Sequence, residues 1–525
     1  MLRIGIDVGG THTDAVLVRG DMVLATTKAL TSADVLGGVC EALENVLATP
    51  GVEPCDVEAV MLGTTQFTNA VVERRELTEV AAIRIGLPSG QGLAPKCGWP
   101  EDIAAALGAS DYAVHGGLLY DGQPLAPLDE RELTTVVDDL VARRVQAVAI
   151  TAAFSPMNPA HEIEVGRRVR AALPAAHITL SHRVGGLGLL ERENAALLNT
   201  SLLPFADRVV GAFTAAVRER GLDCPFFISQ NDGTLMDAEF ARTKPALTFA
   251  SGPTNSLRGA ARLTGLQDAL VVDIGGTTSD IGALRGGFPR QSNMVIEVGG
   301  VRTNFRMPDI LAVGLGGGSL VSEDGDAVGP RSVGHRLVSD GRVFGGNTLT
   351  ATDIVVAADR AQVGDASRVA DLPAATIERA RARMTALLND HIEQMKPNSE
   401  PLPLVLVGGG ALLVTQPLGA ATEVLRPDNA DVANAIGAAI AQIGGEAEEM
   451  FANDDVPREQ ALARVTANAT RAAIEAGAAA NSIEVADVEA TPVSYMARAT
   501  TRYKVRVVGD IAALAGAAGK KEGSE

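Results

Sequence analysis

The chain is poor in aromatic side chains and in positive charge. Aromatic residues make up 3% of its 525 residues, and 45 Lys and Arg stand against 64 Asp and Glu. The resulting net charge of −19 would repel both a nucleic-acid backbone and an anionic membrane surface. Nucleic acid is therefore not an expected partner. No run of about 18 apolar residues occurs either, so we predict no transmembrane helix.

Cysteine is also scarce, and the familiar motifs of hydrolases and zinc sites are missing. The four cysteines show no CxxC spacing, which favours reduced thiols in a cytoplasmic protein. The first residues form a strand pattern with no basic leader, and this too predicts a cytoplasmic location. The sequence contains no GxSxG, HExxH or GxxxxGK[ST] motif. Any nucleotide site in this chain must therefore differ from a Walker A loop.

Glycine, by contrast, is abundant at the ends of strand patterns. The stretch "LRIGIDVGG" is a buried-strand pattern that runs into two glycines, and "DAVLV" resumes as a strand after a short turn. Glycine in such a turn lets an anion approach the backbone N–H groups, and threonine hydroxyls supply further donors. The pattern predicts a β-hairpin that binds phosphate through Gly9, Gly10, Thr11 and Thr13.

An aspartate, Asp7, stands just before this turn. A polyphosphate repels a carboxylate that faces it unless a cation lies between them. Asp7 therefore predicts a bound Mg²⁺, held directly or through water. His12 lies within the same turn, and its residue type leaves two roles open, contact with phosphate or packing of the turn.

The stretch "ALVVDIGGTTSDIGAL" repeats this pattern, with Asp273 in the place of Asp7 and Asp280 in the place of Asp14. A single Gly-Gly hairpin is most often only a tight turn. Recurrence of D-x-GGT-x-[ST]-D, however, indicates a duplicated half-domain. We expect the two hairpins to face each other across a cleft and to hold a triphosphate, with Asp7 and Asp273 as ligands of Mg²⁺. The second set of phosphate-binding residues is then Gly275, Gly276, Thr277 and Thr278.

A third glycine cluster follows a buried-strand pattern in "LPLVLVGGGALL". It is either a tight turn from strand to helix or a place where bare backbone contacts a nucleobase and ribose. Because it follows two phosphate hairpins, we interpret Gly408, Gly409 and Gly410 as an adenosine loop. The run "GLGGGSLVS" is not interpreted as a dinucleotide turn, since no βαβ unit with a downstream acid surrounds it.

These elements, in this order, resemble the actin, Hsp70 and sugar-kinase superfamily. More narrowly, the chain is similar to the ATP-binding subunit of the hydantoinase/oxoprolinase family. The stretches that carry the resemblance are "GIDVGGTHTDAVLV", "LGTTQFTNAVVERR", "LSHRVGGLGLLERENAALLN", "ASGPTNSLRGAARL", "VVDIGGTTSDI", "VGLGGGSLVS" and "TLTATDIVVA".

The resemblance implies an α/β fold of two duplicated actin/Hsp70-like (ribonuclease H-like) halves around an ATP cleft. We expect residues 1–180 to form the first half, residues 181–440 the second half, and residues 441–525 a small C-terminal extension of helix and strands. It also implies ATP-dependent ring opening of a cyclic amide such as a hydantoin or 5-oxoproline, completed by a second protein subunit. Whether identical chains also associate stays open.

Four substrate-binding candidates follow from the resemblance. Asn69 and Arg74 would face the cleft, although a capped helix with an exposed Glu/Arg pair explains them equally well. Arg192 and Asn194 would contact the substrate, although polar residues off the apolar face of a helix are more often solvated. The candidates for orienting the attacking group are the hairpin acids Asp7, Asp14, Asp273 and Asp280, and the sequence does not distinguish among them.

Two other functions compete with amide opening. The first is a small-molecule kinase of the same superfamily, which would release a stable phosphorylated product. The second is an Hsp70-like ATPase that reactivates or assembles a partner enzyme. All three hypotheses share ATP and Mg²⁺, and they differ in what stimulates ATP turnover: a cyclic amide, an alcohol or acid, or a protein partner.

Overall fold

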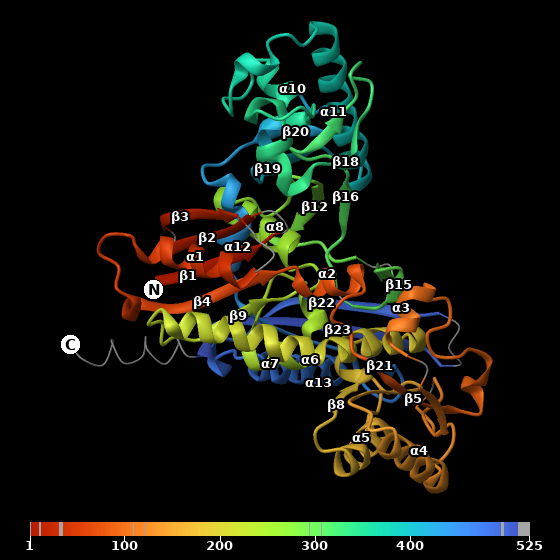
Figure 1. Ribbon diagram of the computed structural model, residues 1–525. Coiled ribbons are helices and arrows are strands. Elements are labelled where there is room, and N and C mark those ends of the chain that lie inside the picture. Colours follow the sequence, from red (N-terminus) through yellow and green to blue (C-terminus); the bar gives the residue numbers. More distant parts are fainter. Residues whose placement is uncertain are drawn as a thin grey trace.

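The computed structural model describes residues 2–9, 12–20, 22–30, 35–108, 110–120, 122–292, 295–305, 307–494 and 498–512. Within these ranges no helix is both long enough and apolar enough to cross a membrane. The described chain contains sheets of nine, six and four strands with helices packed against them (Figure 1). The predicted α/β fold class is confirmed.

The nine-stranded sheet contains the first predicted hairpin and joins strands from both ends of the chain. Its order is β22-β23-β21-β10-β9-β4-β1-β2-β3. The strands are β1 (Leu2–Val8), β2 (His12–Arg19), β3 (Met22–Leu30), β4 (Val57–Thr64), β9 (Phe226–Ser229), β10 (Leu235–Asp237), β21 (Ile443–Ala452), β22 (Glu484–Val493) and β23 (Thr500–Gly509). Along β1, Ile4 and Ile6 enter the core, whereas Gly5 faces the opposite side, as the two-residue period of a strand requires.

Helices cover both faces of this sheet. One face shares a core with α1 (Val35–Leu47), α6 (Leu189–Glu219) and α13 (Arg458–Glu475). The other face packs against α12 (Ala433–Ile440). A strand covered on both sides must be apolar throughout, and this explains the unbroken hydrophobic pattern that precedes the first glycine pair.

The six-stranded sheet contains the second hairpin and forms the upper lobe in Figure 1. Its strands are β11 (Ala269–Ile274), β12 (Ser279–Arg285), β13 (Phe288–Pro289), β16 (Ile310–Val313), β19 (Leu402–Val407) and β20 (Ala421–Leu425). The helices α10 (Ala351–Ala357) and α11 (Ala374–Met395) share one core with it. On its other side, α8 (Ser251–Thr264) packs against β11 and β19.

The four-stranded sheet is parallel and lies in the lower part of Figure 1 with α4 and α5. Its order is β6-β5-β7-β8. The elements are β5 (Ala81–Leu87), β6 (Asp111–His115), α4 (Glu130–Ala142), β7 (Ala147–Ala152), α5 (Ala160–Ala172) and β8 (His177–Leu180). The remaining short elements are α2 (Gln66–Glu73), α3 (Glu101–Ala106), α7 (Ala238–Thr243), α9 (Leu337–Asp340) and the hairpins β14 (Ile296–Val298) with β15 (Val301–Thr303) and β17 (Ser319–Val321) with β18 (Val328–Ser332).

The predicted division at residues 180 and 440 stays a prediction, and the sheets themselves run across both positions. Strands from all three predicted parts join in the nine-stranded sheet, because β9 and β10 connect β4 to β21. The strands after residue 440 therefore continue the sheet of the first hairpin.

Two helices, α8 and α12, cross in direct backbone contact. A Cβ added at Gly259 of α8 would lie 1.9 Å from the carbonyl oxygen of Ala433, and one added at Gly437 of α12 would lie 1.9 Å from that of Asn255. No side chain fits at such distances, so the crossing requires glycine on both helices. Because α12 packs on the nine-stranded sheet and α8 on the six-stranded sheet, this crossing joins the two.

We expect Gly259→Ala to lower the free energy of unfolding by about 1–3 kcal/mol or more, because its methyl group would need space that the α12 backbone occupies. Chemical denaturation followed by circular dichroism measures this change. The matched control is Gly211→Ala in α6, where an added Cβ would approach no atom closer than 3.6 Å. Helix propensity predicts an effect there between zero and a gain of about 1 kcal/mol. Equal losses at both positions would contradict the crossing as described.

Candidate nucleotide-binding site

The two predicted hairpins have the same register. In the first, Asp7 on β1 lies opposite Asp14 on β2, and in the second, Asp273 on β11 lies opposite Asp280 on β12. Each hairpin also pairs through its first strand with a third, parallel strand, which is β4 in the first and β19 in the second. The predicted duplication therefore extends from the sequence motif to a three-stranded unit.

The turns of the two hairpins close in the same way. The backbone N–H of Gly9 donates to the carbonyl of His12 at 3.0 Å, and the N–H of Gly275 donates to the carbonyl of Thr278 at 2.9 Å. The side chain of His12 is exposed at the start of β2. Equivalent hydrogen bonds therefore close both turns at equivalent positions.

The threonines predicted as phosphate donors differ in exposure. Thr277 and Thr278 are exposed at the second turn, whereas Thr13 is fully buried in β2. Gly10 and Thr11 lie outside the described residues. Phosphate binding by the two turns stays a prediction, and the exposed hydroxyls of the second turn are best placed for it.

A glycine in or directly after each third strand makes room for the hairpin carboxylate. A Cβ added at Gly63 of β4 would lie 2.2 Å from Oδ1 of Asp7, and one added at Gly408 after β19 would lie 2.2 Å from Oδ1 of Asp273. Gly408, the first glycine of the predicted adenosine loop, is therefore needed to leave room for Asp273. Its positive φ of 84° also favours glycine. The adenosine contact expected of Gly408, Gly409 and Gly410 stays a prediction.

Consecutive residues of α8 bind the leading acids of both hairpins. The Asn255 side-chain amide donates to Oδ1 of Asp7 at 3.1 Å, and the Ser256 hydroxyl donates to Oδ2 of Asp273. Because these two donors are neighbours on one helix, the acids lie on either side of its N-terminal half. The structure therefore brings the two hairpins together.

The first hairpin is tied to α12 as well. The Asn434 amide donates to Asp7 at 3.1 Å and to Asp14 at 2.9 Å. Lys28 on β3 donates to Asp14 at 2.9 Å and to the carbonyl of Asp431 at 2.6 Å. These contacts compensate part of the negative charge and hold the carboxylates in place.

Burial and mutual repulsion perturb the pKa values of these acids. Burial raises the pKa of Asp7 to about 7; a hydrogen bond from Asn255 opposes this shift, and repulsion from Asp14 and Asp273 adds to it. Burial also raises the pKa of Asp273. Burial, with repulsion from Asp273, raises the pKa of Asp280 to about 7. A cation at this position would relieve the repulsion among the ionised forms.

The donor set suits Mg²⁺ bound together with phosphate. The residues are carboxylates, which are ligands that Mg²⁺ prefers, and this ion is commonly held by one or two carboxylates plus substrate phosphates and water. Among the described residues no group of three or more His, Cys, Asp or Glu forms a cage for a metal ion. Asp7 and Asp273 would therefore hold the ion with phosphate oxygens completing its shell.

The glycine run after β16 supports the second turn. The N–H of Gly317 donates to the carbonyl of Gly275 at 3.0 Å, and the N–H of Gly318 donates to the carbonyl of Gly276 at 2.7 Å. The stretch "GLGGGS" therefore packs against the predicted phosphate turn. Glycine at these two positions lets the two segments lie close together, because an added Cβ at either position would crowd neighbouring atoms.

Two of the predicted substrate residues lie on or just after α2. Asn69 is exposed. Arg74 donates to the carbonyl of Gly299 at 2.8 Å and pairs with Asp102 at 2.9 Å. The guanidinium of Arg74 thus has partners within the protein, and the substrate role of both residues stays a prediction.

The other two predicted substrate residues are buried in α6. Arg192 donates to the Ser181 hydroxyl at 2.9 Å and to the carbonyl of Ala152 at 2.5 Å. Asn194 accepts a hydrogen bond from the Trp99 indole at 2.9 Å. Neither side chain is solvated, because both are covered by surrounding elements. These contacts hold the polypeptide around the start of α6, and a substrate role for them stays a prediction.

Known structures share this fold. The ATP-dependent caprolactamase from Pseudomonas jessenii matches 97% of this chain and 87% of its own with a TM-score of 0.75 at 22% identity. A nucleotide-free acetone carboxylase matches 97% of this chain and 88% of its own with a TM-score of 0.66 at 18% identity. At these identities the likeness establishes the fold alone.

Sequence comparison gives the family. Residues 3–173 match the model of the hydantoinase/oxoprolinase N-terminal region, and residues 192–365 match the hydantoinase/oxoprolinase model. The chain therefore belongs to the hydantoinase/oxoprolinase family, as its motifs predicted.

Curated relatives are longer than this chain. The caprolactamase subunit alpha of Pseudomonas jessenii is 27% identical in an alignment of 435 positions that covers 74% of this chain and 61% of the relative. The acetophenone carboxylase gamma subunit of Aromatoleum aromaticum is 29% identical in an alignment of 245 positions that covers 44% of this chain and 33% of the relative. The chain thus spans less than two thirds of the length of either relative.

Sequence reasoning missed the residues that orient the acids. Asn255 and Ser256 lie in "ASGPTNSLRGAARL", where polar residues precede an apolar helix face. Asn434 and Lys28 lie in segments with no motif. The only available signal was the cluster of small and polar residues at the start of α8, which is unusual for a buried helix.

We expect Asp280→Asn to stabilise the nucleotide-free protein more at pH 8 than at pH 5. The folded pKa of Asp280 is about 7, above the unfolded value of about 4. Between these two pKa values, Asp280 keeps its proton in the folded state and has lost it in the unfolded state. The free energy of unfolding therefore falls as pH rises through this window. Replacing Asp280 with Asn should therefore raise the free energy of unfolding by about 1–4 kcal/mol at pH 8 and by less at pH 5.

Chemical denaturation at the two pH values measures this difference. The control is Asp371→Asn, which replaces an exposed aspartate in the same lobe. This variant should change the free energy of unfolding by the same small amount at pH 5 and at pH 8. An Asp280→Asn variant whose gain is the same at pH 5 and pH 8 would contradict the raised pKa.

Proposed function

We propose that this chain is the ATP-using subunit of an enzyme that opens a cyclic amide. The observation that carries the proposal is the joint attachment of Asp7 and Asp273 to neighbouring residues of α8. A buried acid, Asp7, and a half-buried acid, Asp273, each followed by a glycine turn, suit a metal-bound polyphosphate. The family to which the chain belongs and its lactam-processing relative, by name a caprolactamase subunit, favour an amide as the substrate.

ATP supplies activation of an unreactive carbonyl. Resonance makes an amide a poor electrophile, and transfer of the γ-phosphoryl group to the carbonyl oxygen creates a better leaving group. In this chain, Asp7 and Asp273 would hold Mg²⁺, and the turn N–H groups and the exposed Thr277 and Thr278 hydroxyls would orient phosphate oxygens. The role of these residues is positioning and stabilisation of charge rather than covalent chemistry.

A second subunit is part of the proposal. The caprolactamase and the acetophenone carboxylase relatives are both named as subunits. We infer that water addition and release of the opened product take place with a partner chain. Whether identical copies of this chain also associate is a separate question, which the molar mass of the purified complex answers.

Carbonyl activation in a ketone is the competing function. The acetophenone carboxylase gamma subunit, which is 29% identical over its matched region, is named for a ketone substrate. The same paired hairpins would serve either carbonyl. The two functions differ in whether bicarbonate and a ketone, or a cyclic amide alone, stimulate ATP turnover.

Release of ADP from the complex purified from its native source tests these alternatives. Hydantoin, 5-oxoproline and caprolactam should stimulate it if the proposal is correct, and the opened product should appear in proportion. Stimulation only by acetone or acetophenone with bicarbonate would favour the carboxylase. Stimulation only by alcohols or acids would favour a kinase, and stimulation only by a protein partner would favour a reactivating ATPase.

We expect Asp7→Ala or Asp273→Ala to lower ADP release about a hundredfold or more, since each removes a charge that the metal-bound nucleotide needs. Steady-state assays with saturating Mg²⁺ and ATP measure the loss, and circular dichroism checks the fold. Asp371→Ala is the matched control and should retain full activity. Near-normal ADP release in a folded Asp7→Ala or Asp273→Ala variant would exclude the metal assignment.

A further inference from the structure

A basic segment, residues 331–336, lies against the second predicted phosphate turn. It reads "RSVGHR", and its three basic residues, Arg331, His335 and Arg336, are all exposed. No acid occurs within it, although the chain as a whole has a net charge of −19. An anion is the kind of ligand that such a segment would attract.

Hydrogen bonds hold the basic segment against this turn. The N–H of Gly318 donates to the carbonyl of Gly276 at 2.7 Å, and the carbonyl of Gly318 accepts from the N–H of Val333 at 2.9 Å. The Ser332 hydroxyl donates to the same carbonyl of Gly276 at 3.4 Å. The segment is therefore attached to the turn both directly and through Gly318.

Gly334 brings the segment next to an exposed hydroxyl of the turn. Its φ is positive, at 58°, and a Cβ added there would lie 3.9 Å from the hydroxyl oxygen of Thr277. Thr277 is one of the two exposed threonines that we expect to orient phosphate. Because consecutive Cα atoms lie about 3.8 Å apart, His335 and Arg336 follow close behind. A phosphate group bound by Thr277 is therefore within reach of the long Arg336 side chain.

The Arg336 guanidinium is only weakly held by the rest of the protein. Its ion-pair partner among the described residues is Asp340, at 3.5 Å, and the Arg336 side chain is 62% exposed. An exposed ion pair of this kind contributes little to stability, so exchanging it for a phosphate contact costs little. Arginine also suits phosphate, because its planar group can donate two parallel hydrogen bonds to phosphate oxygens.

The hairpin acids make additional positive charge necessary for phosphate binding. Four carboxylates stand on the paired strands of the two hairpins, and phosphate would add negative charge beside them. Lys28 pairs with Asp14 at 2.9 Å and donates to the carbonyl of Asp431, so its charge already offsets one of these acids. A further cation beside the turn would offset part of the phosphate charge.

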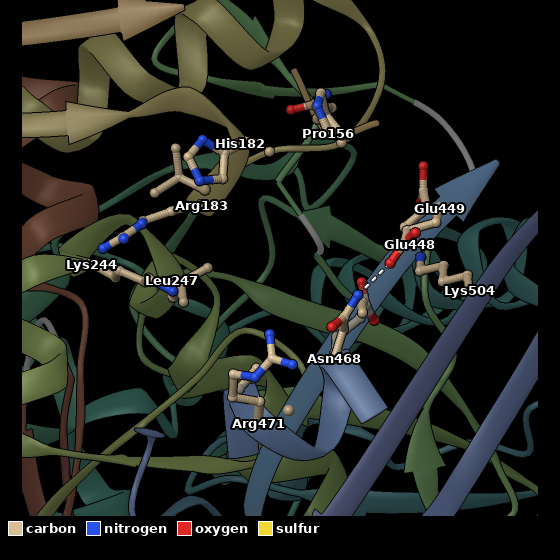
Figure 2. A pocket seen from close by; sticks show the side chains of 18 of the residues that line it. Pro156, His182, Arg183, Lys244, Leu247, Glu448, Glu449, Asn468, Arg471 and Lys504 are labelled. Carbon is tan, nitrogen blue, oxygen red and sulfur yellow. Dashed lines mark hydrogen bonds between the residues drawn. The ribbon is translucent and has the colours of Figure 1, made fainter. Parts of the chain in front are cut away.

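Another group of cations lies elsewhere in the molecule. Figure 2 shows Arg183, Lys244 and Arg471 around a cavity of about 610 Å³ between β21, α13 and the turn Ser181–Arg183. Among the described residues, none from either hairpin lines this cavity. Of these two groups of cations, the basic segment is the one that contacts a predicted phosphate turn.

We propose that Arg336, together with His335, binds the phosphate chain of the nucleotide at the second turn. The guanidinium would donate two hydrogen bonds to phosphate oxygens, and an imidazole N–H would donate a third. The role of both residues is binding and compensation of charge, and it includes no covalent step. This proposal rests on the nucleotide binding in the proposed function and adds residues outside the two hairpins to that site.

Isothermal titration calorimetry of the full chain with ATP and with tripolyphosphate, both in the presence of Mg²⁺, tests the contact. Arg336→Met should weaken the binding of both ligands about tenfold or more, since it removes a charged partner of phosphate. Arg336→Lys should bind with an intermediate affinity, because lysine keeps the charge but lacks the paired donors. Circular dichroism checks that each variant is folded.

Arg331→Met is the matched control. Arg331 is an exposed arginine of the same segment, and it precedes Ser332, whose hydroxyl contacts the turn. Successive side chains of a strand point to opposite faces, so Arg331 projects away from the turn. Its replacement should leave both affinities within about twofold of the unmodified chain. Equal losses in Arg331→Met and Arg336→Met would indicate a general effect of charge and overturn the proposal, as would unchanged binding in Arg336→Met.

The phosphate contact and the amide function fail separately in this design. If Arg336→Met loses affinity for ATP but no cyclic amide stimulates ADP release, the contact stands and the amide function is wrong. If cyclic amides stimulate ADP release and Arg336→Met binds ATP normally, the amide function stands and the contact is wrong. A folded chain that binds neither ATP nor tripolyphosphate would contradict both.

Discussion

Like charges held close together are the constraint on which the rest of this structure depends. The acids Asp7 and Asp14 come from one sheet and Asp273 and Asp280 from another, and their repulsion opposes the approach of the two sheets. Donors on α8 and α12 bind three of the carboxylates and reduce this penalty. Burial is the main cause that raises the pKa of Asp7 and of Asp280 to about 7, and repulsion from neighbouring acids adds to it. The remaining unfavourable energy is what a metal-bound nucleotide would relieve on binding.

Backbone contact between α8 and α12 explains how the acids keep their positions. Helices that touch through Gly259 and Gly437 cannot approach further, and their polar side chains therefore project at fixed places. Asn255 and Ser256 on α8 reach different sheets, and Asn434 on α12 reaches two acids of one hairpin. The geometry of the site is therefore set by a pair of helices rather than by the hairpin turns.

The parts that could be predicted from the sequence are the local ones. A two-residue apolar period followed by paired glycines predicts a hairpin wherever it stands, and its repetition predicted the duplicated unit. Asn434 is far in sequence from Asp7, so no local pattern could reveal their contact. Arg192 and Asn194 lie off the apolar face of α6, a pattern typical of solvated residues, yet they are buried because α6 packs against a sheet on one side and β15 on another. Burial of polar residues by distant parts of the fold cannot be deduced from the hydrophobic periodicity of a helix.

The same helix also adjoins the cavity between β21, α13 and the turn Ser181–Arg183. The Thr254 hydroxyl donates at 3.0 Å to the carbonyl of Asn231, which lines the cavity, and the next two residues bind Asp7 and Asp273. Successive residues of a helix point about 100° apart, so three neighbours can contact three different surroundings. One short stretch of α8 therefore contacts both hairpin acids and the Asn231 loop at the edge of this cavity.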